Sequence, residues 1–208
     1  MLNILLSSRA FCSAAITDAF LSMFPAVDRA NAAIVIIVNA VDNGKRHPQM
    51  LALQQTVRQL GFTQVQLLDV LTDDLTVLDT ADAIILNGGY EFLLLKSLQR
   101  VGLLSRLRQL ALTGKPIYGI SAGAILLGPD LDLYATLYPE DNVDRLTVTT
   151  AIAATAVRIY PHYDRHCEYN PQLPQLITDW ERRTGQIVTR LTNSQGRLLQ
   201  GTRVEVVE

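Results

Sequence analysis

The sequence has few cysteines and no long apolar run. These two features argue against a disulfide-stabilised protein and against a membrane-spanning one. Of its 208 residues only Cys12 and Cys167 are cysteines, and neither belongs to a Cys-x-x-Cys pair. Two cysteines do not make a disulfide framework at this length, so we expect the reducing environment of the cytoplasm. Apolar runs such as Ala32–Val38 have the length of a buried strand, well short of the ~20 residues that span a bilayer. We therefore expect no membrane segment, and Met1–Leu6 lacks the features of a signal peptide.

An excess of basic charge is also missing. The 18 Lys and Arg residues are balanced by 20 Asp and Glu, and the basic residues form no stripe. Seven Tyr and five Phe form no stacking array, so we expect no nucleic-acid partner. Apolar residues make up 49% and charged residues 18%, which favours a large buried core over disorder. We expect residues 1–208 to form one domain, and we allow for a homodimer.

Strand-like and helix-like segments alternate along the first 120 residues. The predicted strands are Leu2–Ser7, Ala33–Asn39, Val65–Val70, Ala83–Leu86 and Pro116–Ile120. The predicted helices are Ser13–Phe24, Pro48–Leu60, Glu91–Arg100 and Leu103–Leu112. The strands are continuous apolar runs, which is typical of burial on both faces. This pattern predicts an α/β fold, a three-layer sandwich in which helices cover both faces of a mainly parallel sheet.

The second part of the chain is less regular. Gly128–Arg145 is long and acidic, and we expect it to be an irregular loop that contributes to function. Leu146–Ile152 and Val157–Tyr160 are predicted strands, and Leu173–Thr184 is a predicted helix. A β-meander is expected at the end of the chain, formed by Gln186–Arg190, Arg197–Gln200 and Arg203–Val207.

A Gly-x-Ser-x-Gly sequence, Gly119–Gly123, follows the last strand of the first part and precedes the helix-like Ala122–Leu127. In this context a sharp strand-to-helix turn presents the serine at the carboxyl end of a sheet. The helix start adds free N–H groups and the positive end of a dipole where an oxyanion would form. Ser121 is therefore the candidate nucleophile, although the same small residues also suit an ordinary helix cap.

A serine nucleophile needs a base, and the chain offers three histidines. His162 follows the predicted strand Val157–Tyr160, so it can reach a nucleophile at a neighbouring strand end, and we predict it to be the base. His47 lies in a polar loop, and His166 is expected at the surface. A metal site made of His162, His166 and Asp164 is not favoured, because no further ligand pattern accompanies them.

The base in turn needs a group that orients it. The acidic segment between Ser121 and His162 supplies the candidate carboxylates. Asp141 and Glu140 are the leading choices, and Asp132 is the third. A solvated acidic face is the alternative explanation for most of this segment.

An oxyanion hole needs two donors, and the backbone can supply both. The N–H of Ala122, directly after the nucleophile, is the first. Gly88 and Gly89 end a predicted strand, and glycine lets a backbone N–H turn toward a ligand without a Cβ in the way. We predict Gly89 to be the second donor, because both loops are expected at the same edge of the sheet.

Three segments, taken in order, resemble the dipeptidase E and cyanophycinase family of serine peptidases. They are Asn87–Leu95, Tyr118–Ala124 and Pro161–Asp164. In that family a Gly-Gly-Asn-Thr-Phe loop supplies an oxyanion donor, a Ser-Ala-Gly turn carries the nucleophile, and a Pro-His-Phe/Tyr segment carries the base. The resemblance implies a class I glutamine amidotransferase-like (flavodoxin-like) fold. It also implies cofactor-free and metal-free hydrolysis of a peptide or isopeptide bond in a small peptide, through a Ser-His-Asp/Glu triad.

The chain departs from this family at two places. The Asn-Thr that follows the glycines in the family is Tyr90–Glu91 here. Together with Gly88, these residues are expected to line the substrate pocket, so selectivity for an N-terminal aspartate is not implied. The acidic segment does not align with the family pattern, which leaves the third member of the triad open.

Two other functions stay open at this point. One is an esterase of the α/β-hydrolase type, although no His-Gly-Gly-Gly motif precedes the serine and few strands follow it. The other is a non-catalytic protein that binds a small ligand at the carboxyl edge of the sheet.

Overall fold

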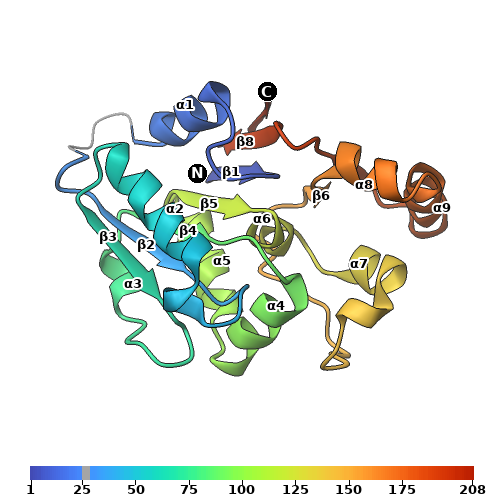
Figure 1. The fold of residues 1–208 in the computed structure, drawn as a ribbon, viewed down its shortest axis with the longest axis horizontal. Coiled ribbons are helices and arrows are strands. Elements are labelled where there is room, and N and C mark those ends of the chain that lie inside the picture. Colours follow the sequence, from blue (N-terminus) through green and yellow to red (C-terminus); the bar gives the residue numbers. More distant parts are fainter. Residues whose placement is uncertain (25–28) are drawn as a thin grey trace.

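A seven-stranded sheet forms the centre of the molecule in the computed structural model, which describes residues 1–24 and 29–208 (Figure 1). The strand order is β3-β2-β4-β5-β1-β8-β9. The strands are β1 (Asn3–Ser7), β2 (Ala33–Ile37), β3 (Gln64–Leu68), β4 (Ala83–Leu86), β5 (Ile117–Ile120), β8 (Gly196–Gln200) and β9 (Arg203–Val207). Strands β1 to β5 are parallel, and β8 and β9 add an antiparallel hairpin beside β1. The predicted mainly parallel α/β sheet is confirmed.

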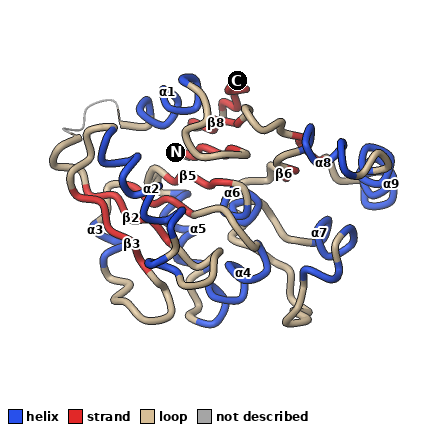
Figure 2. Tube along the Cα trace, in the orientation of Figure 1, coloured by secondary structure: helices blue, strands red, loops and turns tan. Residues whose placement is uncertain are grey.

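Helices cover both faces of this sheet (Figure 2). On one face lie α1 (Ala14–Ser22) and α2 (Pro48–Gln59), and on the other lie α3 (Val77–Thr80), α4 (Glu91–Arg100), α5 (Leu104–Leu112) and α6 (Ala122–Leu127). Successive strand residues point to opposite faces of the sheet. Because all residues of β2 are apolar, this strand packs against the helices on both faces. Ile34 and Ile36 pack toward α1 and α2, whereas Val35 and Ile37 pack toward the other layer.

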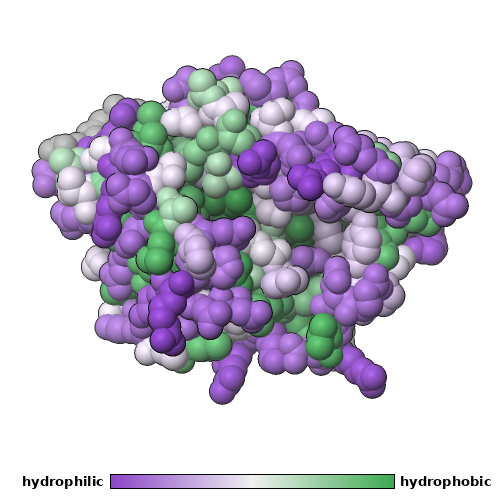
Figure 3. Space-filling view, viewed as in Figure 1, coloured by the Kyte–Doolittle hydropathy of each residue, from purple (hydrophilic) through white to green (hydrophobic). Residues whose placement is uncertain are grey.

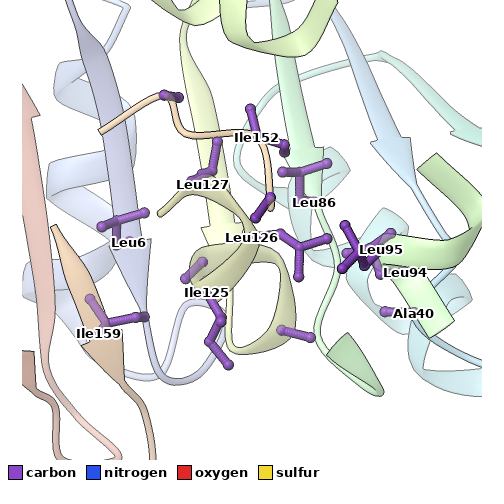
Figure 4. Packing of buried hydrophobic residues seen from close by; sticks show 14 of the residues in the cluster. Leu6, Ala40, Leu86, Leu94, Leu95, Ile125, Leu126, Leu127, Ile152 and Ile159 are labelled. Atoms are coloured by element: carbon purple, nitrogen blue, oxygen red, sulfur yellow. The ribbon is translucent and has the colours of Figure 1, made fainter. Parts of the chain in front are cut away.

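The helix that follows β5 is the most deeply buried. Every residue of α6 is buried. Figure 4 shows Ile125, Leu126 and Leu127 of this helix among Leu6 and Leu86 of the central strands. Burial on all sides fixes the start of α6, which is the position of the candidate nucleophile.

The second part of the chain differs from several expectations. The segment predicted to be irregular, Gly128–Arg145, contains α7 (Asp132–Leu137) and the short 3-10 helix η2 (Pro139–Asp141). A further 3-10 helix, η1 (Gly44–Arg46), precedes α2. The predicted strand Leu146–Ile152 is absent, since only a single bridge joins Thr150 to Asp130 there. The prediction failed because only the end of this segment, Ala151 and Ile152, is buried, and its N–H groups donate to the carbonyls of Pro129 and Leu126 instead of to a strand.

The expected terminal meander was also wrong. Strand β7 (Val188–Arg190) pairs in parallel with β6 (Arg158–Tyr160) to form a separate two-stranded sheet, and only β8 and β9 form a hairpin. Between β6 and β7 lie α8 (Tyr163–Tyr169), which was not predicted, and α9 (Leu173–Thr184), which was. No helix in the described ranges is long and apolar enough to cross a membrane.

An ion pair with a buried guanidinium joins three elements of this second part. The guanidinium of Arg158, with a side chain only 6% exposed, binds both carboxylate oxygens of Asp130, one of them at 2.8 Å. The same guanidinium lies 5.1 Å from the centre of the Trp180 ring on α9. The pair therefore joins β6, the loop before α7, and α9.

We expect Asp130→Ala to lower the free energy of unfolding by about 3 kcal/mol, because it leaves a buried guanidinium without its carboxylate. The measurement is urea unfolding at equilibrium. Asp179→Ala, which breaks the exposed pair between Asp179 and Arg182, is the control and should cost less than about 0.5 kcal/mol. Equal losses for the two variants would contradict the argument.

Candidate active site

Ser121 lies at the turn between β5 and α6, in a backbone conformation that serine rarely adopts. Its φ is 48° and its ψ is −111°, a strained combination for a residue with a Cβ. The turn is held by a hydrogen bond from Ser121 N–H to the Ser7 carbonyl at 2.8 Å and by one from Gly123 N–H to the Asn87 carbonyl at 3.1 Å. The neighbouring strand ends β1 and β4 thus fix the serine at the carboxyl edge of the sheet.

Close contacts with neighbouring backbone explain why the Gly-x-Ser-x-Gly motif has glycine at both ends. A Cβ on Gly119 would lie 2.6 Å from Cα of Ala124, and one on Gly123 would lie 2.2 Å from the Leu86 carbonyl oxygen. Both distances are far inside van der Waals contact, so α6 can start this close to β4 and β5 only with glycine at both positions.

The loop after β4 reaches the same place, as the sequence predicted. A Cβ on Gly88 would lie 3.2 Å from Cβ of Ser121. Gly89 has a φ of 144°, and a Cβ there would lie 2.1 Å from the Ala40 carbonyl oxygen. Within the described part of the chain, the N–H groups of Gly88, Gly89 and Ala122 donate no hydrogen bond. Free backbone donors therefore lie beside the Ser121 hydroxyl, as an oxyanion hole requires.

His162 approaches Ser121 from the small sheet. It follows β6, and its Nε2 lies 3.0 Å from Oγ of Ser121. Its backbone has a left-handed conformation, with φ at 57°, and its N–H donates to Oγ of Ser8 at 3.2 Å. The nucleophile and base that the sequence proposed, separated by 41 residues, are therefore in hydrogen-bond contact.

The partner of the other imidazole nitrogen is an amide that the sequence analysis missed. Nδ1 of His162 lies 2.6 Å from Oδ1 of Asn193. An amide oxygen can only accept, so Nδ1 carries the proton and Nε2 is left to accept one from Ser121. Asn193 is itself held in place, because its N–H donates to Asp164 and its carbonyl accepts from the Cys12 thiol.

The predicted carboxylates do not contact His162 in the described residues. Glu140 and Asp141 lie in η2, where Glu140 is exposed and Asp141 lines a different part of the cavity. Asp132 begins α7 and accepts a hydrogen bond from Thr149. The expectation failed because the pairing of β6 with β7, which brings Asn193 next to His162, joins segments that the sequence did not show to be neighbours. The position of Asn193 just after a strand was the only available signal.

His166 is not a surface residue, contrary to expectation. It is half-buried one helical turn after His162, and its Nδ1 lies 2.9 Å from the Tyr160 hydroxyl. Burial lowers the pKa of His166. The described residues contain no group of three His, Cys, Asp or Glu side chains that could hold a metal ion.

A cavity of about 1020 Å³ opens over these residues. Figure 3 shows the molecule hollowed near its middle, between the region of α2 and that of α7 to α9. Its lining includes the apolar side chains of Phe11, Met50 and Leu53. Polar groups also line it, among them Glu91, Tyr138, Tyr160, Asp141 and His166, together with Ser121 and His162.

Comparison with known proteins identifies the family of this chain. The model of peptidase family S51 matches residues 4–207. This chain belongs to peptidase family S51. The resemblance to the dipeptidase E family is thereby confirmed, and the protein is a hydrolase of the serine peptidase type. The alternative of a non-catalytic binding protein is set aside.

Solved structures agree with the fold of this S51 peptidase. A candidate peptidase E protein from Listeria monocytogenes EGD-e superposes with a TM-score of 0.78 at 22% identity, covering 99% of this chain and 98% of that one. A peptidase from an acI-B1 Actinobacterium gives a TM-score of 0.71 at 17% identity, covering 100% and 87%. The fold is the glutamine amidotransferase-like one, as predicted, and differs from that of the α/β-hydrolase alternative.

One curated protein shares a shorter stretch. Pyridoxal 5'-phosphate synthase subunit PdxT from Fervidobacterium nodosum is 33% identical over 57 residues. That stretch is 27% of the S51 peptidase chain and 30% of the length of PdxT.

Glu91 lines the cavity of the S51 peptidase, as the sequence predicted, whereas Tyr90 is 65% exposed and is not part of the lining. Glu91 is the first residue of α4 and is largely shielded from solvent. Burial raises its pKa to about 7, and the negative charge of Asp141 adds to this effect. A carboxylate with a raised pKa destabilises the folded state when it is ionised, so Glu91 lowers the stability of the fold at a pH above its pKa.

We expect the stability of the S51 peptidase to fall as pH rises through the titration range of Glu91. Between 4.5 and about 7 the folded chain keeps a proton that the unfolded chain releases. Glu91→Gln removes this penalty, so at pH 8 the variant should be more stable than wild type by about 1 to 2 kcal/mol, after allowing for partial exposure. Urea unfolding at pH 5 and pH 8 measures this, and a gain no larger at pH 8 than at pH 5 would contradict it.

Proposed function

We propose that this S51 peptidase hydrolyses a peptide or isopeptide bond of a small peptide through an acyl-enzyme on Ser121. The single observation that supports it most is the 3.0 Å contact between Oγ of Ser121 and Nε2 of His162. This contact lies at a strained turn beside unused backbone N–H groups. Nucleophile, base and oxyanion donors are thus in reach of one reacting carbonyl.

Each residue has a distinct part in the proposed reaction. His162 accepts the proton of Ser121 as the oxygen attacks the carbonyl carbon, and the N–H groups of Gly89 and Ala122 bind the oxyanion. His162 then protonates the leaving amine, and water hydrolyses the acyl-enzyme by the same route. Asn193 keeps the imidazole in the tautomer that leaves Nε2 free to accept.

An amide in the third position has a chemical consequence. A carboxylate would stabilise the imidazolium that forms during attack, whereas Asn193 orients the ring without adding a negative charge. Orientation therefore accounts for its effect in this proposal. The proposed site of action is the cytoplasm, as the low cysteine content suggests.

The nucleophile is tested by Ser121→Ala. We expect kcat/KM toward small peptides to fall by about 10⁴-fold or more, because no acyl-enzyme can form. Labelling by a fluorophosphonate probe should occur on wild type and be absent from the variant. Turnover by the variant at a wild-type rate would refute the mechanism.

The role of Asn193 is tested with a series of variants. Asn193→Ala should lower kcat/KM by about 10- to 100-fold through loss of ring orientation. Asn193→Asp should retain more activity and move the acid limb of the pH profile to higher pH, because a carboxylate favours the protonated imidazole.

The matched control is Glu140→Gln, which alters an exposed acid outside the cavity lining. This variant should leave the pH dependence of kcat/KM unchanged. If Glu140→Gln costs as much activity as Asn193→Ala, the orienting role belongs to the acidic segment instead.

A further inference from the structure

Glu91 lies among polar groups on one wall of the cavity that holds Ser121. Its carboxylate is close enough to Tyr134 and Tyr160 to raise the pKa of both phenols, although burial is the larger cause for each. Tyr138 and Asp141 belong to the same wall. Glu91 begins α4, directly after the loop that carries Gly88, where an added Cβ would lie 3.2 Å from Cβ of Ser121. A substrate bound at Ser121 therefore lies within reach of this wall.

The carboxylate of Glu91 has no cationic partner among the described residues. Its hydrogen bond comes from its own backbone N–H. Among the other half-buried carboxylates, Asp130 binds Arg158 and Glu181 binds Arg190, while Asp69 accepts hydrogen bonds from Asn39 and from the Leu71 N–H. A half-buried carboxylate that faces an open cavity without a counter-ion can be neutralised only by a proton or by a cation that enters.

The second charge on this wall has the same sign. Asp141 is the charged group that acts on Glu91, and the effect is repulsive. Arg9 also lines the cavity, but it lies next to His162 and Asn193, with Arg165, in an adjoining depression. The cavity thus has an acidic wall and a basic rim, and an anionic group near Glu91 would be repelled.

We propose that Glu91 makes this site selective for peptides that carry a cationic group, an ammonium or a guanidinium, and selective against acidic ones. The inference rests on the proposed function, because it concerns which substrates reach Ser121. A cation beside Glu91 and Asp141 replaces the missing counter-ion, and the tyrosine hydroxyls of the wall can accept hydrogen bonds from it. The adjoining Arg9 suits the free carboxylate of a short peptide.

The experiment compares dipeptides of the form X-Ala in which X is lysine, norleucine or glutamate. Norleucine keeps most of the lysine chain without its charge. Each dipeptide is also used with its amino group acetylated, which separates the two sources of positive charge, the side chain and the amino terminus. We expect removal of at least one of these charges to lower kcat/KM by about 10-fold or more, and glutamate to be the poorest side chain.

The variant Glu91→Gln should abolish that charge preference, since it keeps the shape and removes the charge. The matched control Glu140→Gln makes the same chemical change on an exposed residue outside the cavity and should leave the preference intact. In wild type the ratio of kcat/KM for the charged and uncharged partners should rise between pH 6 and pH 8, as Glu91 ionises. The ratio cancels any pH effect that is common to both substrates. Its rise should vanish in Glu91→Gln, which distinguishes Glu91 from Asp141, His166 and the tyrosines Tyr134, Tyr138 and Tyr160.

A binding measurement covers the case in which the variant is poorly folded. Protection of Ser121 in wild type from a fluorophosphonate probe needs no turnover. Lysine amide should protect at about 10-fold lower concentration than the amide that lacks the preferred charge, which is norleucine amide for the side chain or Nα-acetyllysine amide for the amino terminus. Equal protection by all three amides, or a preference for glutamate among the dipeptides, would overturn the inference. Absence of both labelling and hydrolysis would instead overturn the proposed function, so the two failures are distinguishable.

Discussion

The contact between Oγ of Ser121 and Nε2 of His162 depends on two separate sheets that end at the same point. The large sheet delivers the serine at the end of β5, and the small sheet delivers the histidine at the end of β6. Hydrogen bonds between the two strand ends, from Ser121 to Ser7 and from His162 to Ser8, tie both to the end of β1. The strained backbone at Ser121 and at His162 is held by this network, since neither conformation would persist in a free loop.

The same arrangement explains why the site contains an asparagine. Pairing of β6 with β7 places the residues after β7 beside His162, and Asn193 is the residue that reaches Nδ1. In the acidic segment, Glu140 is exposed and Asp141 lines the cavity, where its charge acts on Glu91. The acidic side chains Asp141 and Glu91 therefore lie in the lining of the cavity, while the neutral amide of Asn193 orients the imidazole.

This distribution links stability to function. The Arg158 guanidinium is buried and binds the Asp130 carboxylate, and the pair joins β6, the loop before α7 and α9. Glu91 has no cationic partner among the described residues, so it destabilises the fold when it is ionised. The carboxylate that helps to hold the fold is paired with a cation, and the carboxylate proposed to select substrate is not.

The sequence by itself determined the parallel sheet, the strand-to-helix turn at Ser121 and the choice of His162, because these depend on local patterns: apolar runs, small residues around a serine, and a histidine just after a strand. It did not determine that Leu146–Ile152 is a loop, that β7 joins β6, or that Asn193 and not Asp141 meets the histidine. Only the tertiary structure decided these points. The physical reason is that strand pairing between distant segments and the burial of a side chain depend on what packs around them, and a local pattern does not contain that information.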